Sequence, residues 1–361
     1  MKTKIVKVSS KTKDAKIFDE AGRLIRAGEL VAFPTETVYG LGANGLDAAA
    51  CRKIYEAKGR PSDNPLILHV ADRAMIDMIA ADVSPLAEKL IASFCPGPIT
   101  IIMPKKPCVP DSVTGGLGTV GIRMPDSDVC RALIAAAGVP IAAPSANISG
   151  RPSPTTAEMV ARDMDGRIPL ILDAGPCEFG VESTIVACDA DDKITILRPG
   201  AITREMLLEI TSDVELDPAI KGTMTDSDAH PRAPGMKYRH YAPKAPLALI
   251  EPKNLTAKNV AAMLIREISA AKSQDKKIGL IVSDETTKII EEKNIVPKEY
   301  IKSYGHQCDL KAIAANIYRL LRSFDDTDRT QLYAEATTRD GLGLAIMNRL
   351  TKSSGGNIIT E

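Results

Sequence analysis

The sequence contains no tryptophan, and its seven cysteines include no C-x-x-C pair. An odd number of cysteines without paired spacing argues against a disulfide framework and against a structural zinc site, and it fits a reducing compartment. No apolar run approaches the roughly 20 residues that span a bilayer, and the lysine-rich start lacks the apolar stretch of a signal peptide. We therefore expect a cytoplasmic protein with no membrane segment and no metal held by side chains.

The sequence also has no net charge, because 46 Lys and Arg balance 46 Asp and Glu. A neutral chain is not expected to form a stable complex with long nucleic acid. No G-x-x-x-x-G-K-[ST] motif is present, which excludes a Walker-type ATPase. Residues Gly40–Gly45 match G-x-G-x-x-G, but the preceding apolar strand ends at Phe33 and Pro34–Tyr39 intervenes. A dinucleotide fingerprint needs these glycines directly after the strand, so a Rossmann site here is not favoured.

The length of 361 residues favours two domains, and the 44% hydrophobic content is typical of globular proteins. Up to about residue 210, strands mix unevenly with helices, which predicts an α/β domain with a mixed, twisted sheet. The expected strands are Glu29–Phe33, Leu66–Val70, Ile99–Pro104, Thr119–Met124, Val139–Ala143, Leu170–Asp173, Ser183–Cys188 and Ile194–Arg198. The expected helices are Ala15–Ala27, Asp47–Ala57, Ala74–Ala80, Ser84–Phe94, Asp128–Ala137 and Thr155–Asp163.

A segment dense in Pro, Gly, Ser and Asp, Lys221–Pro246, then indicates a linker. Beyond it, a second set of elements predicts a smaller, Rossmann-like α/β domain. Its expected elements are strands Leu247–Ile250 and Ile278–Ser283 and helices Ala257–Ala271, Glu285–Glu292 and Leu310–Arg322. The predicted organisation is a large domain over 1–215, a linker over 216–246 and a small domain over 247–361.

The segment Lys58–Pro65 is the first candidate for binding. A lysine in the last turn of a helix before a glycine is a common stabilising arrangement, and for Lys58 taken alone this is the better explanation. Arg60, however, lies beyond the helix in a loop stiffened by prolines. A lysine and an arginine presented rigidly together suit anionic oxygens.

Further candidates lie where predicted strands end. Arg123 shares the polar face of its strand with Thr119, and Gly121 would let a ligand approach the backbone. A half-exposed strand with a solvated arginine is an equally good explanation of that pattern. Other polar or basic side chains at strand ends or before a helix are Thr35, Ser145, Asn147, Ser153, Ser183 and Arg198. Fixed donors without an activated nucleophile favour phosphoryl or nucleotidyl transfer.

Five segments, PTETVYGLG, KGRPSDNPL, PSANISGRPSP, ESTIV and LRPG, together resemble the YrdC-like threonylcarbamoyl-AMP synthase family. The resemblance covers residues 10–245 and extends through APGMKYRHYAP and GLGLAIMNRLTKSSGG to the long, two-domain form of the family. It implies a YrdC-like sheet with a large concave cavity. It also implies a nucleotidyltransferase that converts L-threonine, bicarbonate and ATP, with Mg²⁺, into threonylcarbamoyl-adenylate and pyrophosphate.

The product implied by the resemblance feeds threonylcarbamoyladenosine formation in tRNAs that read ANN codons, through a downstream tRNA threonylcarbamoyl transferase. The family's K-x-R and S-x-N signatures fall on Lys58, Arg60, Ser145 and Asn147. By position, the residues that would hold threonine are Thr35, His69, Arg123, Ala143 and Ser183. Those that would hold ATP are Lys58, Asn64, Thr119, Ser145, Ser153, Arg198 and Tyr238.

The linker contains two of the four histidines, His230 and His240, together with Tyr238 and Tyr241. We expect Pro234–Pro243 to close over the nucleotide as a lid. A non-catalytic RNA-binding protein of the translation apparatus is the alternative of a different class. The low aromatic content and neutral charge weigh against it. Carbamoyl-transfer domains of hydrogenase-maturation proteins carry zinc-finger cysteine pairs, which this chain lacks.

Overall fold

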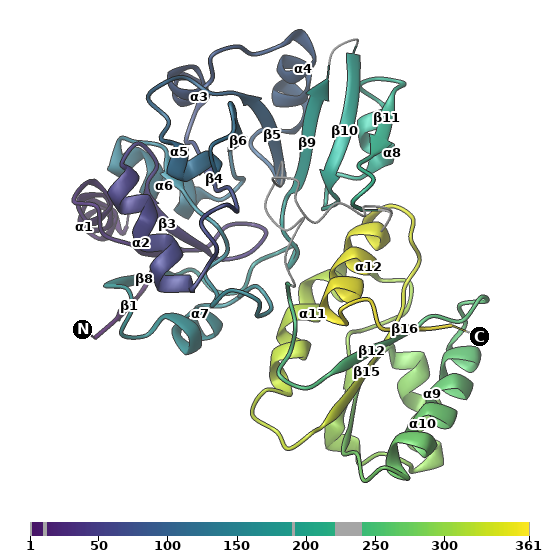
Figure 1. Cartoon of the computed structure of the whole chain (residues 1–361). Coiled ribbons are helices and arrows are strands. Elements are labelled where there is room, and N and C mark those ends of the chain that lie inside the picture. Colours follow the sequence, from purple (N-terminus) through teal and green to yellow (C-terminus); the bar gives the residue numbers. More distant parts are fainter. Residues whose placement is uncertain (1, 10–12, 190–191, 221–239, 361) are drawn as a thin grey trace. The chain divides into compact units, whose positions relative to one another are not determined.

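The computed structural model describes residues 2–9, 13–189, 192–220 and 240–360. The chain divides into two compact units (Figure 1). The first comprises Met1–Ser149 and Ser153–Tyr238, and the second comprises Gly150–Pro152 and Arg239–Glu361. None of the described helices is long and apolar enough to cross a membrane.

In the described part of the first unit, eleven strands form one mixed sheet in the order β1-β8-β2-β3-β7-β4-β6-β5-β9-β10-β11. Parallel pairs such as β4 with β6 stand beside antiparallel pairs such as β2 with β3. The strands are β1 (Lys4–Lys7), β2 (Val31–Phe33), β3 (Gly40–Asn44), β4 (Ile67–His69), β5 (Ile99–Pro104), β6 (Thr119–Arg123), β7 (Ile141–Ala142), β8 (Leu170–Asp173), β9 (Thr184–Asp189), β10 (Lys193–Arg198) and β11 (Val214–Leu216).

The helices of the first unit begin and end where the sequence offers caps. Helix α2 begins after Asp47, whose side chain accepts hydrogen bonds from the backbone of Ala49 and Ala50, and it ends at Gly59 with φ of 60°. The helices are α1 (Ala15–Arg26), α2 (Ala48–Lys58), α3 (Arg73–Ile79), α4 (Pro85–Phe94), α5 (Asp111–Thr114), α6 (Asp128–Ala137), α7 (Ala157–Met164) and α8 (Arg204–Leu208).

The second unit is built on a parallel sheet in the order β14-β13-β15-β12-β16. Figure 1 shows α9 and α10 on one side of this sheet and α11 and α12 on the other, as in Rossmann-like folds. Its elements are β12 (Leu247–Ile250), α9 (Ala257–Lys272), β13 (Ile278–Val282), α10 (Asp284–Lys293), β14 (Ile301–Ser303), α11 (Leu310–Ser323), β15 (Gln331–Glu335), α12 (Leu342–Ser353) and β16 (Ile358–Ile359). The predicted fold class, a mixed twisted sheet with a smaller Rossmann-like domain, is confirmed.

The second unit also holds three residues of the long loop between β7 and α7. Arg322, on α11 and only 4% exposed, donates from Nε and Nη2 to the Pro152 carbonyl oxygen at 3.0 and 2.6 Å. The Ala242 amide donates to the carbonyl oxygen of Gly150. Nearby, Tyr241 adopts a left-handed φ of 65° and stacks on Tyr318 at 5.3 Å. These contacts hold Gly150–Pro152 within the second unit.

Several short or peripheral elements, among them β1, α5, β11 and β14, have no counterpart in the sequence prediction. Two further differences lie close to the predicted site residues. Helix α7 begins at Ala157 and not at Thr155, because the Thr156 side chain accepts the hydrogen bond of the Met159 amide and caps the helix. The G-x-G-x-x-G stretch is largely strand β3, for which the sequence gave no strand prediction, and it pairs antiparallel with β2. The glycines of this stretch therefore do not form the strand-to-helix turn of a dinucleotide site. This agrees with the sequence analysis, which did not favour such a site.

Candidate active site

Lys58 joins the two motifs that the sequence analysis singled out. The side chain is 2% exposed, and its Nζ donates to the carbonyl oxygens of Ser145 and Asn147 at 2.5 Å each. The Ser145 hydroxyl in turn donates to Asn147 Oδ1 at 2.6 Å. The Ser149 amide donates to the carbonyl oxygen of Lys58. The end of α2 and the loop after β7 are thus joined in one hydrogen-bonded frame. Lys58 links the two segments and also supplies a positive charge.

The other cation of the first motif faces its own loop. The Arg60 guanidinium donates from Nη2 to the Pro65 carbonyl oxygen at 3.1 Å and, at 3.4 Å, to that of Asn64. Asn64 is 1% exposed, and within the described part of the chain its Oδ1 has no hydrogen-bond partner. Thr119 and Gly121 line a small cavity of about 10 Å³ that Pro65, the next residue along the chain, also lines. A buried acceptor without a donor suits a ligand that supplies an N–H.

Ser183 and Arg198 meet where β9 and β10 lie side by side. Arg198 donates from Nε to the Ser183 carbonyl oxygen and from Nη2 to Ser183 Oγ, both at 3.0 Å. Ser183 Oγ also lies 2.8 Å from Thr100 Oγ1. Residues predicted to hold threonine and ATP are therefore in direct contact here. Ser153, fully buried, donates to Glu182 Oε1 at 2.5 Å.

A buried ion pair that the sequence analysis did not predict lies in the same region. Arg123 Nη2 is 2.7 Å from Oε1 of Glu36, and both side chains are about 5% exposed. Glu36 follows β2 in the loop that also carries Thr35. Glu36 was not among the residues predicted for the site. The available signal was a single carboxylate in a loop leaving a buried strand.

The hydroxyl of Thr35 makes hydrogen bonds to the backbone of its own loop. It accepts from the amides of Thr37 and Val38, at 3.1 and 3.2 Å, and donates to the Val38 carbonyl oxygen at 2.7 Å. Ala143, which is 4% exposed, donates its amide to the Ile67 carbonyl oxygen. These two predicted threonine contacts serve first to shape the walls of the site. Tyr238, predicted to bind ATP, and most of the expected lid lie outside the described residues.

His69 lies beside Arg123, because the two residues are register partners of the parallel strands β4 and β6. Burial, together with the positive charges of Arg123 and Arg198, lowers the pKa of His69 to about 3. The imidazole is therefore neutral at physiological pH. It can position a ligand by hydrogen bonding, and it is a poor proton acceptor.

The lowered pKa of His69 predicts acid sensitivity. Because an unfolded histidine titrates near pH 6.5, the unfolded chain binds the proton more tightly. The free energy of unfolding should thus fall as pH decreases from about 6.5 towards 3, by up to about 1.4 kcal/mol per unit. Urea unfolding should show a shallower fall for His69→Gln than for the wild type over the upper part of this range. Parallel curves for the two proteins would contradict the assignment.

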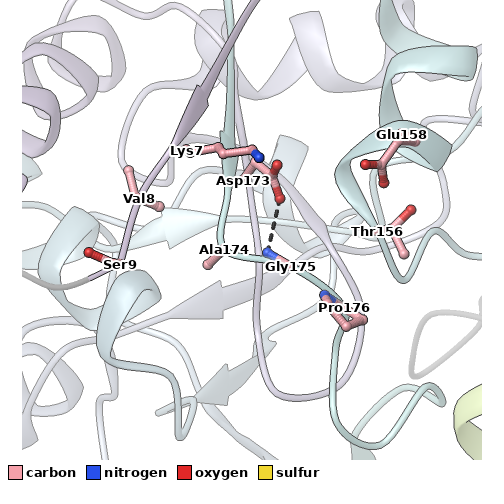
Figure 2. Close-up of a pocket in the computed structure, with 9 residues that line it drawn as sticks. All are labelled: Lys7, Val8, Ser9, Thr156, Glu158, Asp173, Ala174, Gly175 and Pro176. Atoms are coloured by element: carbon pink, nitrogen blue, oxygen red, sulfur yellow. Dashed lines mark hydrogen bonds between the residues drawn. The ribbon is translucent and has the colours of Figure 1, made fainter.

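A separate groove of about 510 Å³ lies at the carboxyl ends of the parallel strands β1 and β8. Figure 2 shows the side chains of Lys7, Asp173 and Glu158 around it, with the Gly175 amide donating to Asp173 Oδ1 at 2.9 Å. None of the residues predicted for catalysis or substrate binding lines this groove. The predicted site residues instead gather around Lys58, Arg123 and Ser183.

Comparison with protein-family models gives two matches. Residues 23–200 match a family described as telomere recombination, and residues 202–355 match the C-terminal domain of threonylcarbamoyl-AMP synthase. The chain is 46% identical over 341 residues to a threonylcarbamoyl-AMP synthase of Bacillus subtilis, covering 94% of this chain and 93% of that one. A protein of the same name from Pyrococcus abyssi is 42% identical over 358 residues, covering 99% of both chains.

Among solved structures, a crystal structure of Pyrococcus abyssi Sua5 in complex with L-threonine superimposes with a TM-score of 0.90. The match is 41% identical and covers 99% of this chain and all of that one. Both units of the present chain therefore have counterparts in that protein.

Proposed function

Because the chain belongs to the threonylcarbamoyl-AMP synthase family, we propose that the residues around Lys58, Arg123 and Ser183 form its active site. The chain catalyses formation of threonylcarbamoyl-AMP, with L-threonine as a substrate. ATP and bicarbonate are the other two substrates that this product requires. The relatives named as synthases favour the enzyme over the RNA-binding alternative.

The observation that carries the assignment is the frame around Lys58. Its buried ammonium joins the K-x-R and S-x-N motifs through the carbonyl oxygens of Ser145 and Asn147. An ammonium held in place by two carbonyl acceptors presents a fixed positive charge. Adenylyl transfer needs such a charge, because negative charge builds on the phosphate oxygens in the transition state. Arg60 and Arg198 add positive charge on the nucleotide side, and Arg123 binds the threonine carboxylate.

We propose Mg²⁺ as the partner of ATP. The described residues contain no cluster of three or more His, Cys, Asp or Glu side chains suited to a metal ion. Mg²⁺ usually keeps several waters and is often bound mainly through substrate phosphates, so ATP itself would supply most of its ligands. When bound, the ion neutralises phosphate charge, and the protein residues Lys58, Arg60 and Arg198 complement it.

The adenylate is a reactive mixed anhydride and needs an acceptor. We propose that a tRNA threonylcarbamoyl transferase takes it up for modification of tRNAs that read ANN codons. A downstream enzyme that receives the product directly would limit its hydrolysis in water.

Pyrophosphate release tests the proposed reaction. The purified protein with ATP and Mg²⁺ should release pyrophosphate only when both L-threonine and bicarbonate are present. Omission of either substrate should reduce release to the background of ATP hydrolysis. Pyrophosphate release that does not depend on threonine would contradict the proposal.

A further inference from the structure

The ion pair between Glu36 and Arg123 is incompletely hydrogen-bonded. The two residues are 7% and 4% exposed, and Arg123 Nη2 lies 2.7 Å from Glu36 Oε1. Nevertheless, within the described part of the chain neither carboxylate oxygen of Glu36 makes a hydrogen bond of good geometry. The same holds for Nε and Nη2 of Arg123. Two oxygens of Glu36 and two nitrogens of Arg123 are thus buried in an ion pair without well-aligned hydrogen bonds.

Such an arrangement is costly if its role is purely structural. Removing a charge from water costs several kcal/mol, and attraction between the partners repays this only when their hydrogen bonds are well made. Buried polar atoms without good partners are rare in proteins and are often found where a ligand or catalysis uses them. The pair therefore fits a site that is completed by a ligand carrying both charges.

We propose that Glu36 binds the ammonium group of threonine and accepts the proton that its nitrogen loses during carboxylation. This inference rests on the proposed function. In an α-amino acid the carboxylate and the ammonium sit on one carbon, so both can reach a carboxylate and a guanidinium that touch each other. The Arg123 fork matches the ligand carboxylate, and the Glu36 oxygens accept from its ammonium. In the complex, the threonine carboxylate takes the place of Glu36 as the partner of Arg123. The threonine ammonium takes the place of Arg123 as the partner of Glu36. Both new contacts have better hydrogen-bond geometry than the ion pair.

The reaction releases a proton that needs an acceptor. Threonine's ammonium and bicarbonate combine to a carbamate when a nitrogen–carbon bond forms and a carbon–oxygen bond of bicarbonate breaks. Water leaves, and one proton is released in addition. A carbamate oxygen then attacks the α-phosphorus of ATP, and the bond to pyrophosphate breaks. Glu36 takes the released proton at one of its carboxylate oxygens and later returns it to solvent.

The other titratable groups near Arg123 are poor acceptors. Burial lowers the pKa of His69 to about 3, so its imidazole binds a proton weakly at neutral pH. Burial raises the pKa of the Cys95 thiol to about 11 and that of the Cys177 thiol to about 12. Burial also raises the pKa of Cys130. These thiols stay protonated at neutral pH and do not accept a proton. Glu36 is chosen as the acceptor because its carboxylate lies in direct contact with Arg123.

The test separates a contact with the ammonium from support of Arg123. Binding of L-threonine is measured by calorimetry and compared with binding of the dihydroxy acid in which a hydroxyl replaces the ammonium. Glu36→Gln should weaken threonine binding about 10- to 100-fold, as expected for loss of a charge-assisted hydrogen bond. It should leave binding of the dihydroxy acid within about threefold. Arg123→Gln should weaken both ligands.

A control variant and the rate of pyrophosphate release are measured as well. Glu178→Gln, an exposed glutamate later in the chain, should leave both affinities unchanged. At saturating threonine, Glu36→Gln should release pyrophosphate about 100-fold more slowly, a typical loss for a missing proton acceptor. Glu36→Asp keeps the carboxylate and should recover part of both effects. It also serves as the second variant if the glutamine protein folds poorly, which thermal melting would reveal.

Two results would overturn the inference. Unchanged threonine affinity and rate in Glu36→Gln would remove Glu36 from the site. Equal weakening of threonine and the dihydroxy acid would show that Glu36 only orients Arg123. Wild-type protein that binds no threonine would instead contradict the proposed function itself, and this is measured before any variant.

Discussion

Replacing Lys58 with methionine is expected to lower the rate of threonylcarbamoyl-AMP formation by about 100- to 1,000-fold, the loss typical of a preorganised electrostatic contact. The change removes a positive charge from the nucleotide side. It also removes both hydrogen bonds that Lys58 Nζ donates, so the carbonyls of Ser145 and Asn147 lose a donor. Lys58→Arg should not restore the rate, because a planar fork cannot replace a point charge between two carbonyls.

The matched control is Lys53→Met on the same helix. Its side chain is 42% exposed and pairs with Glu29 at the surface, a contact worth little. This variant should keep the wild-type rate, measured as threonine-dependent pyrophosphate release. A Lys58→Met protein that folds and retains more than about a tenth of the wild-type rate would contradict the role given to this lysine.

Gly200→Ala is expected to destabilise the first unit by about 1–3 kcal/mol, the usual cost of overpacking a core. A Cβ at position 200 would lie 2.4 Å from the amide nitrogen of Thr184 and 2.7 Å from the carbonyl oxygen of Glu182. Both contacts are backbone atoms on either side of Ser183, which cannot move aside as a flexible side chain can. Displacing Ser183 should also disturb its contacts with Arg198 and Thr100 and weaken threonine binding.

Chemical denaturation measures the change in stability, and calorimetry measures threonine affinity. Gly118→Ala is the control, because a Cβ there meets no atom within 4 Å. It should leave the free energy of unfolding within about 0.5 kcal/mol of the wild type. If Gly200→Ala unfolds at the wild-type denaturant concentration and binds threonine normally, the close approach of these backbones is not needed.

Local signals in the sequence predict many elements because they act within a few residues. The Asp128–Ala137 helix has the predicted bounds, since Ser127 caps its start and Gly138, with φ of 67°, ends it. Strand β5 likewise matches its apolar run. The bounds of these elements depend mainly on the residues inside and beside them.

Strand β3 shows where local signals fail. Its glycines carry no side chain, so the alternation that marks a strand is absent from Gly40–Asn44. The strand forms because β2 supplies the backbone partners and because other side chains need the space. A Cβ on Gly42 would lie 2.6 Å from the Phe33 ring and 2.7 Å from Ile141. That requirement comes from distant parts of the chain.

The sequence also predicts only part of the candidate site. Basic and polar residues at strand ends, such as Arg123 and Ser183, could be proposed from the sequence because ligand sites of α/β sheets gather there. The contacts that these residues make with one another could not be predicted. The contact between Glu36 and Arg123 joins the loop after β2 to the end of β6, and no spacing rule brings these segments together. The hydrogen bond from Arg322 to the Pro152 carbonyl oxygen likewise joins residues that are far apart in the sequence.

The proposed reaction joins threonine, bicarbonate and ATP in one product. Mass spectrometry of a reaction with carbon-13-labelled bicarbonate tests this directly. We expect a threonylcarbamoyl-adenylate that carries the label in its carbamoyl group and forms only when threonine and ATP are both present. An unlabelled product, or pyrophosphate released without any threonine-containing adenylate, would contradict it.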